Sequence, residues 1–130
     1  MPTSLSGQTF RFTPPCVQTE HLYIILSEPD KDGDFVIVNL TSTILNREQL
    51  VLLKRGDHPY ITENCIPLYS AAALLNTKDL IMFREQHQVT LFFEADEPCE
   101  EWLLKKIRAG LLQVKHIDKK IQHYCKQFNW

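Results

Sequence analysis

The chain has 130 residues, of which 44% are hydrophobic and 23% charged, and its formal net charge is −2. A chain of this length and balance is typical of one soluble globular domain that buries its own core. The composition excludes a membrane span, because no apolar run approaches the roughly 18–20 residues that a bilayer requires. The first residues lack the charged and apolar regions of a secretion signal, so we expect a cytoplasmic protein.

The charge is distributed unevenly along the chain. Residues 1–100 carry 7 Lys and Arg against 14 Asp and Glu, whereas residues 101–130 carry 7 against 2. A basic C-terminal segment therefore follows an acidic body. One alternative is that this segment contacts an external partner, which is either nucleic acid or the acidic face of a protein. The other is that it docks on the acidic domain of its own chain. The sequence leaves both alternatives open.

Two strands are predicted early in the chain. His21–Ser27, "HLYIILS", is a short run of β-branched and aromatic residues, and Phe35–Ser42, "FVIVNLTS", is a second. The stretch between them, Glu28–Asp34, holds Pro, Gly and three Asp, which favour a turn. These features predict an antiparallel hairpin with a long loop.

Further short apolar runs follow in the middle of the chain. Three of these runs are predicted to be strands: Gln49–Asp57, Cys65–Ser70 and Asp79–Phe83. The sequence does not decide the secondary structure of two others, Ala71–Asn76 and Gln88–Asp96. Pro67 lacks a backbone donor, so the second of these strands is expected at a sheet edge.

The periodicity changes after Pro98. Glu100 and Glu101 favour a helix start, and Gly110 is predicted to cap the end of that helix. A second helix is predicted over residues 116–127. Because strands precede helices, we expect an α+β, mainly β fold in which residues 1–97 form a small barrel and residues 98–130 a basic helical extension packed on it, as a single domain.

Several chemistries are excluded by the absence of their motifs. The chain has no phosphate-binding or dinucleotide-binding glycine pattern, and no HExxH or GxSxG motif. The four cysteines, Cys16, Cys65, Cys99 and Cys125, form no CxxC pair, so we interpret them as reduced structural thiols. No metal and no other cofactor is expected.

The densest polar cluster is "KRGDHPYI", residues 54–61. A histidine that titrates near neutral pH, here His58, can move protons, and the cations Lys54 and Arg55 can stabilise a phosphate. Those are parts of a metal-free RNA cleavage site. In the alternative interpretation Asp57 caps a turn through the backbone, and His58 is held by a carbonyl group.

Residues 21–83 resemble the PemK/MazF superfamily of plasmid-maintenance toxins. The resemblance lies in "HLYIILS", in "FVIVNLTS" with its final Thr41-Ser42, and in "ENCIPLYSAAALLNTKDL" of residues 63–80. It implies a small SH3-like antiparallel β-barrel, here followed by two C-terminal α-helices. It also implies a metal-independent endoribonuclease of a toxin–antitoxin system, with an RNA substrate, an antitoxin protein as partner, and dimerisation through a barrel face.

The resemblance also suggests roles for individual residues. Thr41 and Ser42 would orient the scissile phosphate, Lys54 or Arg55 would bind RNA and neutralise it, and His58, oriented by Asp57, would move the proton, with His21 as a reserve acid. The chain departs from the family where "LLNT" replaces an arginine-containing motif. The second hypothesis is therefore a catalytically inactive SH3-like barrel that binds protein.

Overall fold

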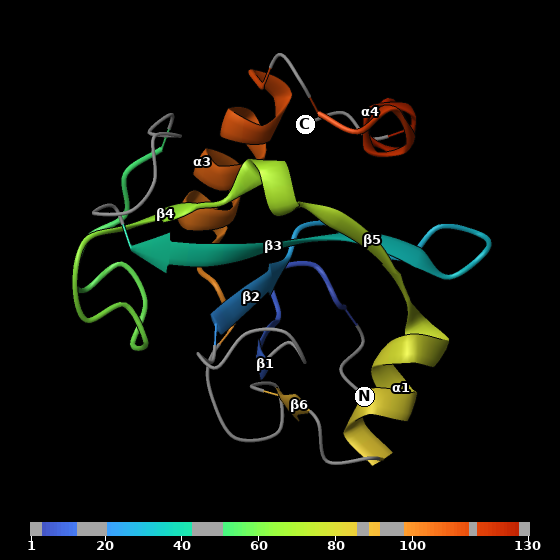
Figure 1. The fold of residues 1–130 in the computed structure, drawn as a ribbon, viewed down its shortest axis with the longest axis horizontal. Helices are drawn as coiled ribbons and strands as arrows, with labels where there is room; N and C mark the ends of the chain where they lie inside the picture. The colour runs from blue at the N-terminus through green and yellow to red at the C-terminus, as the bar shows by residue number, and fades with distance from the viewer. Residues whose placement is uncertain are drawn as a thin grey trace.

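The computed structural model describes residues 4–12, 21–42, 51–85, 89–91, 98–114 and 117–127. Six antiparallel strands form one sheet: β1 (Thr9–Phe12), β2 (His21–Ile25), β3 (Asp34–Ser42), β4 (Cys65–Pro67), β5 (Ala73–Asn76) and β6 (Val89–Leu91). The helices are α1 (Thr77–Glu85), α3 (Glu101–Leu112) and α4 (Lys119–Cys125), and a 3-10 turn spans Tyr69–Ala71. The fold is thus mixed α+β (Figure 1).

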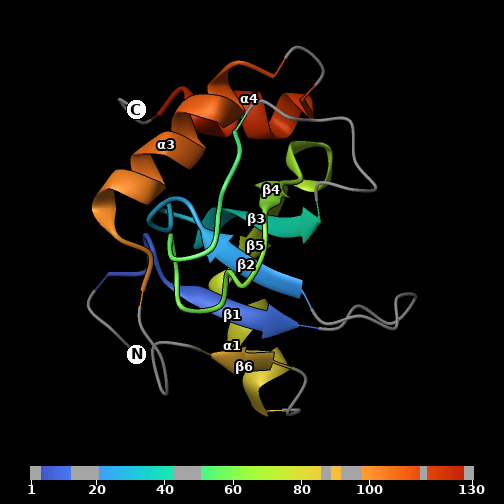
Figure 2. The same cartoon turned by 90° about the vertical axis from the view of Figure 1, so that its left-hand side faces the viewer.

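The long strand β3 organises the sheet. One edge pairs with β2, and the other pairs with β4 near the end of β3 and with β5 near its start. The sheet continues from β2 to β1 and then β6. Among the described strands no pairing joins β6 to β4 or β5, so the sheet is open, and the closed barrel expected from the sequence is not confirmed (Figure 2).

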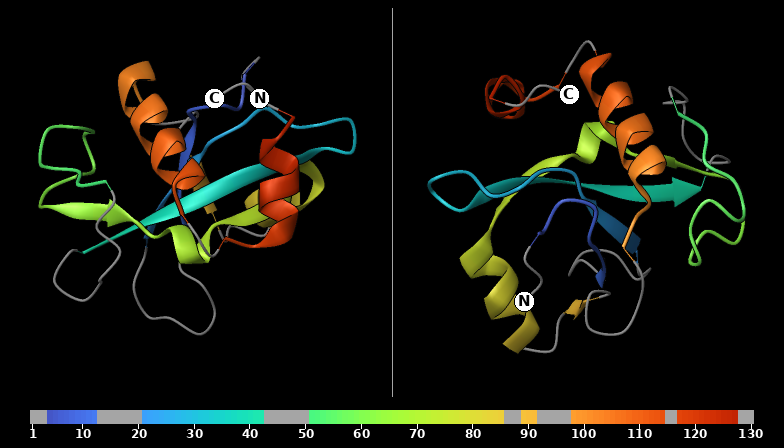
Figure 3. Two further views of the ribbon diagram at one scale, coloured as in Figure 1. Left: turned by 90° about the horizontal axis from the view of Figure 1, so that it is seen from above. Right: turned by 180° about the vertical axis from the view of Figure 1, so that it is seen from behind.

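Side chains alternate between the two faces of the sheet, and each face has its own core. The first, which we call the helix face, contributes Ile24, Val36, Val38 and Leu40 and packs under α3 and α4. The opposite face, which we call the α1 face, contributes Phe10, Ile25, Phe35 and Ile37 and packs with Leu80 of α1. Figure 3 shows α3 and α1 on opposite sides of the sheet.

Helix α3 lies against the 3-10 turn after β4. The Tyr69 hydroxyl donates a 2.7 Å hydrogen bond to the Ile107 carbonyl. A Cβ added at Gly110 would lie 2.2 Å from the Tyr69 hydroxyl oxygen and 2.6 Å from a methyl of Val51. The prediction that Gly110 caps the helix is therefore wrong: it lies inside α3, where the absence of a side chain permits this close approach.

The basic helix α4 docks on the acidic β2–β3 hairpin. The Tyr124 hydroxyl lies 2.7 Å from the carbonyl oxygens of both Glu28 and Asp34, which share its single proton, and it accepts a 3.1 Å hydrogen bond from the Ser27 hydroxyl. Burial raises the pKa of Tyr124, so the phenol stays protonated and keeps its donor. Of the two alternatives for the C-terminal segment, docking on the chain's own acidic body is observed for α4.

Most strands and helices agree with the sequence-based predictions. The β2–β3 hairpin and the two C-terminal helices are confirmed. The edge strand predicted over Cys65–Ser70 is confirmed only for Cys65–Pro67, because Tyr69 and Ser70 lie in the 3-10 turn. Of the segments that the sequence left open, Ala73–Asn76 is a strand, and Val89–Leu91 pairs with β1, whereas residues 88 and 92–96 lie outside the described ranges.

Two strand predictions are wrong in the described residues. Asp79–Phe83 belongs to α1, where Asp79 lies in the first turn and favours the helix macrodipole. Of the predicted strand Gln49–Asp57, residues 49 and 50 lie outside the described ranges. Leu53 makes only an isolated bridge to Cys65. None of the described helices is long and apolar enough to cross a membrane.

Gly110→Ala should lower the free energy of unfolding by about 1–3 kcal/mol, because the new methyl group would overpack the contact with Tyr69. Alanine favours helix by about 1 kcal/mol over glycine, so propensity alone predicts the opposite sign. Urea denaturation of the variant and wild type measures the difference. Ala109→Gly, the reverse change at an exposed neighbouring position, measures the effect of helix propensity alone. A Gly110→Ala protein as stable as wild type would contradict the packing argument.

Glu28 connects three parts of the fold. Its carboxylate accepts hydrogen bonds from the Ser4 hydroxyl at 2.5 Å and from the Leu5 and Ser6 amides at 3.0 and 2.9 Å. Arg108 of α3 donates to the Leu26 carbonyl at 2.7 Å and to the Ser6 hydroxyl. Burial acts to raise the pKa of Glu28, but these hydrogen bonds and the charge of Arg108 outweigh it, so the pKa is lowered.

A lowered pKa means that the Glu28 carboxylate stabilises the fold above its unfolded pKa near 4.5, and that this stability is lost as the pH falls through the folded pKa. Glu28→Gln should therefore be less stable than wild type near neutral pH, with a difference that shrinks as the pH falls below about 4.5. Urea midpoints across this range measure the difference. Glu63→Gln, at an exposed carboxylate, is the control, and a Glu28→Gln difference independent of pH would refute the assignment.

Candidate functional site

The loop Lys54–Tyr60 begins where Leu53 bridges Cys65 beside the end of β3. The Asp57 amide donates to the Lys54 carbonyl at 3.0 Å, and the Lys54 amide donates to the Asp57 carboxylate at 2.9 Å. Gly56, at φ +98°, lies between them in a conformation that suits glycine. The carboxylate of Asp57 thus caps the turn, as the alternative interpretation of the sequence expected.

His58 is 3% exposed and faces the interior of this loop. The Tyr60 amide donates to its Nδ1 at 3.2 Å, and its own carbonyl accepts from the Ile61 amide at 2.9 Å. A ring nitrogen that accepts a hydrogen bond carries no proton, so the neutral imidazole must hold its proton on Nε2. At Nδ1 the ring is therefore held by an amide donor of its own loop.

A hollow of about 420 Å³ lies between this loop and the start of α3. Arg55 and Lys54 are exposed beside it, and Asp57 is half-buried. The described residues that line it come from two segments: Arg55, Gly56, Asp57, His58, Pro59, Ile61 and Thr62 from the loop, and Pro98 and Glu100 from the approach to α3. The lining thus combines one cation, two carboxylates and one imidazole.

Arg11 of β1 completes the surroundings of the loop. Its guanidinium carbon lies 4.6 Å from the centroid of the Tyr60 ring, which is a cation–π geometry. Tyr60 is 36% exposed, and its centroid lies 6.0 Å from that of His58. The sequence did not assign Arg11 a role. In the sequence, Arg11 is a single charged residue between Phe10 and Phe12, which by itself indicates no function. Only the fold places its guanidinium on the Tyr60 ring.

The other predicted residues lie elsewhere. His21 and Thr41 fall on the α1 face by strand alternation, whereas the loop packs through Ile61 on the helix face. The His21 Nδ1 lies 3.4 Å from the Leu40 carbonyl. Ser42 pairs with Cys65 through the backbone, and its side chain lies outside what the structure describes. The structure therefore brings Lys54, Arg55, Asp57 and His58 together, but not His21 or Thr41 with them.

The described cysteines are poor nucleophiles. Burial, with smaller contributions from nearby carboxylates, raises the pKa of Cys65 to about 11 and that of Cys99 to about 12, and burial raises the pKa of Cys125 to about 11. All three stay protonated near neutral pH and are free thiols, while Cys16 lies outside the described residues. In the part of the chain that the structure describes, no group of three or more His, Cys, Asp or Glu residues is arranged to hold a metal ion.

Comparison of the chain with protein-family models, with curated proteins and with solved structures finds no match. Its function must therefore be argued from the residues and contacts themselves.

The contacts of His58 predict its tautomer. Long-range ¹H–¹⁵N correlation spectra of the histidine rings should show the His58 proton on Nε2, because Nδ1 accepts from the Tyr60 amide. His21 offers an internal contrast, since its Nδ1 faces a carbonyl and should carry the proton. Spectra of His58→Asn and His21→Asn assign the two rings, and a His58 proton on Nδ1 would contradict the arrangement.

Proposed function

We propose that this chain is a PemK/MazF-like toxin-type protein that binds RNA at the loop Lys54–Ile61 and cleaves it without a metal. The observation that carries the proposal is the guanidinium of Arg11 stacked on the partly exposed ring of Tyr60. Lys54 and Arg55, in the same loop as Tyr60, are exposed. Aromatic rings and arginine planes stack on bases, and cations nearby neutralise phosphates, so the combination suits a nucleic-acid strand.

The contacts of His58 change its proposed role. A general base must offer an unprotonated ring nitrogen to the ribose hydroxyl, but Nδ1 of His58 is engaged by the Tyr60 amide and Nε2 carries the proton. We therefore propose that His58, which is 3% exposed, holds the loop that presents Lys54 and Arg55 to the phosphate and does not move the proton itself. His21, on the α1 face, does not share this hollow with it.

The finer fold assignment belongs to the same proposal. We propose that the sheet is an open variant of an SH3-like barrel. Antiparallel pairing from β4 through β3, β2 and β1 to β6 supports this assignment, as does the edge of β3 that β4 and β5 share. Strands β4 and β5 follow one edge of β3 in succession and are separated by the 3-10 turn Tyr69–Ala71.

One observation favours the second candidate, a non-catalytic SH3-like module that binds protein. Asp57 and His58 both accept backbone hydrogen bonds within their own loop, which is how polar residues stabilise a structural turn. In that case the loop preserves its conformation for binding, and proton transfer is not required of it.

The two candidates are separated by measuring RNA binding and RNA cleavage on the same variants. Fluorescence anisotropy with labelled single-stranded RNA in EDTA should show binding by wild type that is weakened about tenfold or more by Arg55→Glu. Lys31→Glu, an identical charge change at an exposed site on the β2–β3 hairpin, is the matched control. Gel analysis of the same RNA should show cleavage by wild type.

His58→Asn and His58→Ala test this positioning role, because an asparagine oxygen can still accept from the Tyr60 amide whereas alanine cannot. His58→Asn should fold and keep both RNA binding and cleavage, and His58→Ala should weaken both. Binding by wild type without cleavage would refute the endoribonuclease. Neither binding nor cleavage would leave the protein-binding module as the better account.

A further inference from the structure

The hollow between the loop Lys54–Tyr60 and the start of α3, which we call the loop hollow, is lined by two carboxylates as well as by Arg55. Two negative charges repel phosphate groups, so the backbone of an RNA strand does not fit inside this lining. Lys54 and Arg55 are exposed and offer positive charge to the backbone outside it. The carboxylates of Asp57 and Glu100 therefore face a different part of the strand.

Glu100 occupies the N-cap position of α3, but its side chain does not cap the helix. Ser, Thr, Asp and Asn are the residues that cap helices well, so the helix start does not explain a glutamate here. Its carboxylate instead accepts a 2.6 Å hydrogen bond from Nε1 of Trp102. The Trp102 side chain is 48% exposed. This contact orients the carboxylate and holds an accessible indole ring beside a residue of the lining.

Asp57 is oriented in a similar way on the loop side of the hollow. One of its oxygens accepts a 2.9 Å hydrogen bond from the Lys54 amide. Within the described residues, neither Asp57 nor Glu100 accepts a hydrogen bond through its second carboxylate oxygen. A carboxylate that one N–H group already holds in place can accept from a ligand with little further loss of entropy.

We propose that the loop hollow binds one unpaired guanine base of an RNA strand, with Trp102 as a stacking residue; this inference rests on the proposed RNA binding. Aromatic side chains stack on unpaired bases, and the edges of such bases are then read by hydrogen bonds. The volume of the hollow, about 420 Å³, lies within the range of about 300–1,000 Å³ that is usual for ligand pockets.

The two carboxylates favour guanine over the other bases. On its Watson–Crick edge guanine carries adjacent imino and amino N–H groups, and one carboxylate can accept from both. Uracil has a single N–H group between two carbonyl oxygens, which a carboxylate repels. Adenine and cytosine place their amino group beside an unprotonated ring nitrogen, whose lone pair also faces the carboxylate. Guanine is therefore the base that complements Asp57 and Glu100 best.

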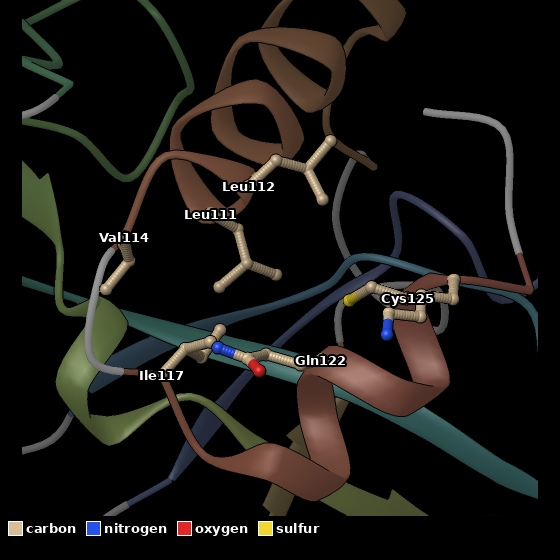
Figure 4. Close-up of a pocket in the computed structure, with 7 residues that line it drawn as sticks. Leu111, Leu112, Val114, Ile117, Gln122 and Cys125 are labelled. Carbon is tan, nitrogen blue, oxygen red and sulfur yellow. The ribbon is translucent and has the colours of Figure 1, made fainter.

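A second hollow, of about 350 Å³, lies at the other end of α3, between α3 and α4, and we call it the α3–α4 hollow. In Figure 4 the Leu111 side chain points into the space between the helices, with Val114 and Ile117 on one side of it and Cys125 on the other. The described lining consists of aliphatic side chains, one thiol, one amide and one lysine. It holds no carboxylate and no aromatic ring, so the guanine site is assigned to the loop hollow.

The test uses the full chain and three short fluorescein-labelled strands of 2′-O-methyl RNA, in which the blocked hydroxyl prevents cleavage. One strand is all uridine, and the others carry one central guanosine or one central inosine. Anisotropy should show that the guanosine strand binds about tenfold more tightly than the uridine strand. Inosine lacks the amino group of guanosine, so its strand should bind with intermediate affinity.

Glu100→Gln should abolish the preference for guanosine without weakening binding of the uridine strand. A glutamine oxygen can still accept from Trp102, but its amide group then presents donors to the base in place of an acceptor. Glu101→Gln is the matched control, because it makes the same change at the next, exposed residue, which does not line the loop hollow. This variant should keep the preference.

Trp102→Ala should weaken binding of the guanosine strand about fivefold or more, because a stacking surface is lost. Leu112→Ala, at a residue of similar exposure near the other end of α3, should bind like wild type. The guanosine strand should also quench the fluorescence of Trp102 in Trp130→Phe protein, in which Trp102 is the single tryptophan. Circular dichroism establishes that each variant is folded.

The outcomes distinguish the guanine site from the RNA binding on which it rests. Equal affinity of wild type for all three strands would refute the guanine site and leave RNA binding intact, whereas no binding of any strand would refute both. Loss of the preference in Glu101→Gln as well as in Glu100→Gln would overturn the role of Glu100. An inosine strand that binds as tightly as the guanosine strand would contradict recognition of the amino group.

Discussion

The close contact between Tyr69 and α3 is the constraint on which both hollows depend. The 3-10 turn after β4 brings the Tyr69 hydroxyl to the Ile107 carbonyl, and Gly110 lets the helix approach this closely. That contact is one of those that hold α3 against the sheet. Because the start of α3 borders the loop hollow and its end borders the α3–α4 hollow, one packing interaction places two surfaces of different chemistry.

Buried polar contacts hold the elements that the apolar core alone would leave loosely oriented. Tyr124 fixes α4 to the acidic hairpin through two carbonyl acceptors, and Glu28 with Arg108 ties the N-terminal segment to α3. A hydrogen-bonding group that is left without a partner at such a position costs free energy. Each contact therefore favours one arrangement of the elements over others, and its net contribution to stability is smaller. Docking of α4 leaves its lysines exposed.

In the loop Lys54–Tyr60, some polar residues hold the turn and others are exposed. Asp57 and His58 accept backbone donors, which holds the turn, while Lys54 and Arg55 stay exposed. A loop held in this way presents its cations and Tyr60 in one conformation, which reduces the entropy lost on binding.

The sequence by itself determined the local features: the β2–β3 hairpin, the edge strand at Pro67, the two C-terminal helices and the turn around Gly56. Each depends on periodicity, turn chemistry or helix-start residues within a few positions. Tertiary structure alone decided that Gly110 packs on Tyr69 and that Arg11 lies on Tyr60. It also placed His21 and Thr41 on the face opposite the loop. These outcomes arise from contacts between residues far apart in the chain, which local patterns do not encode.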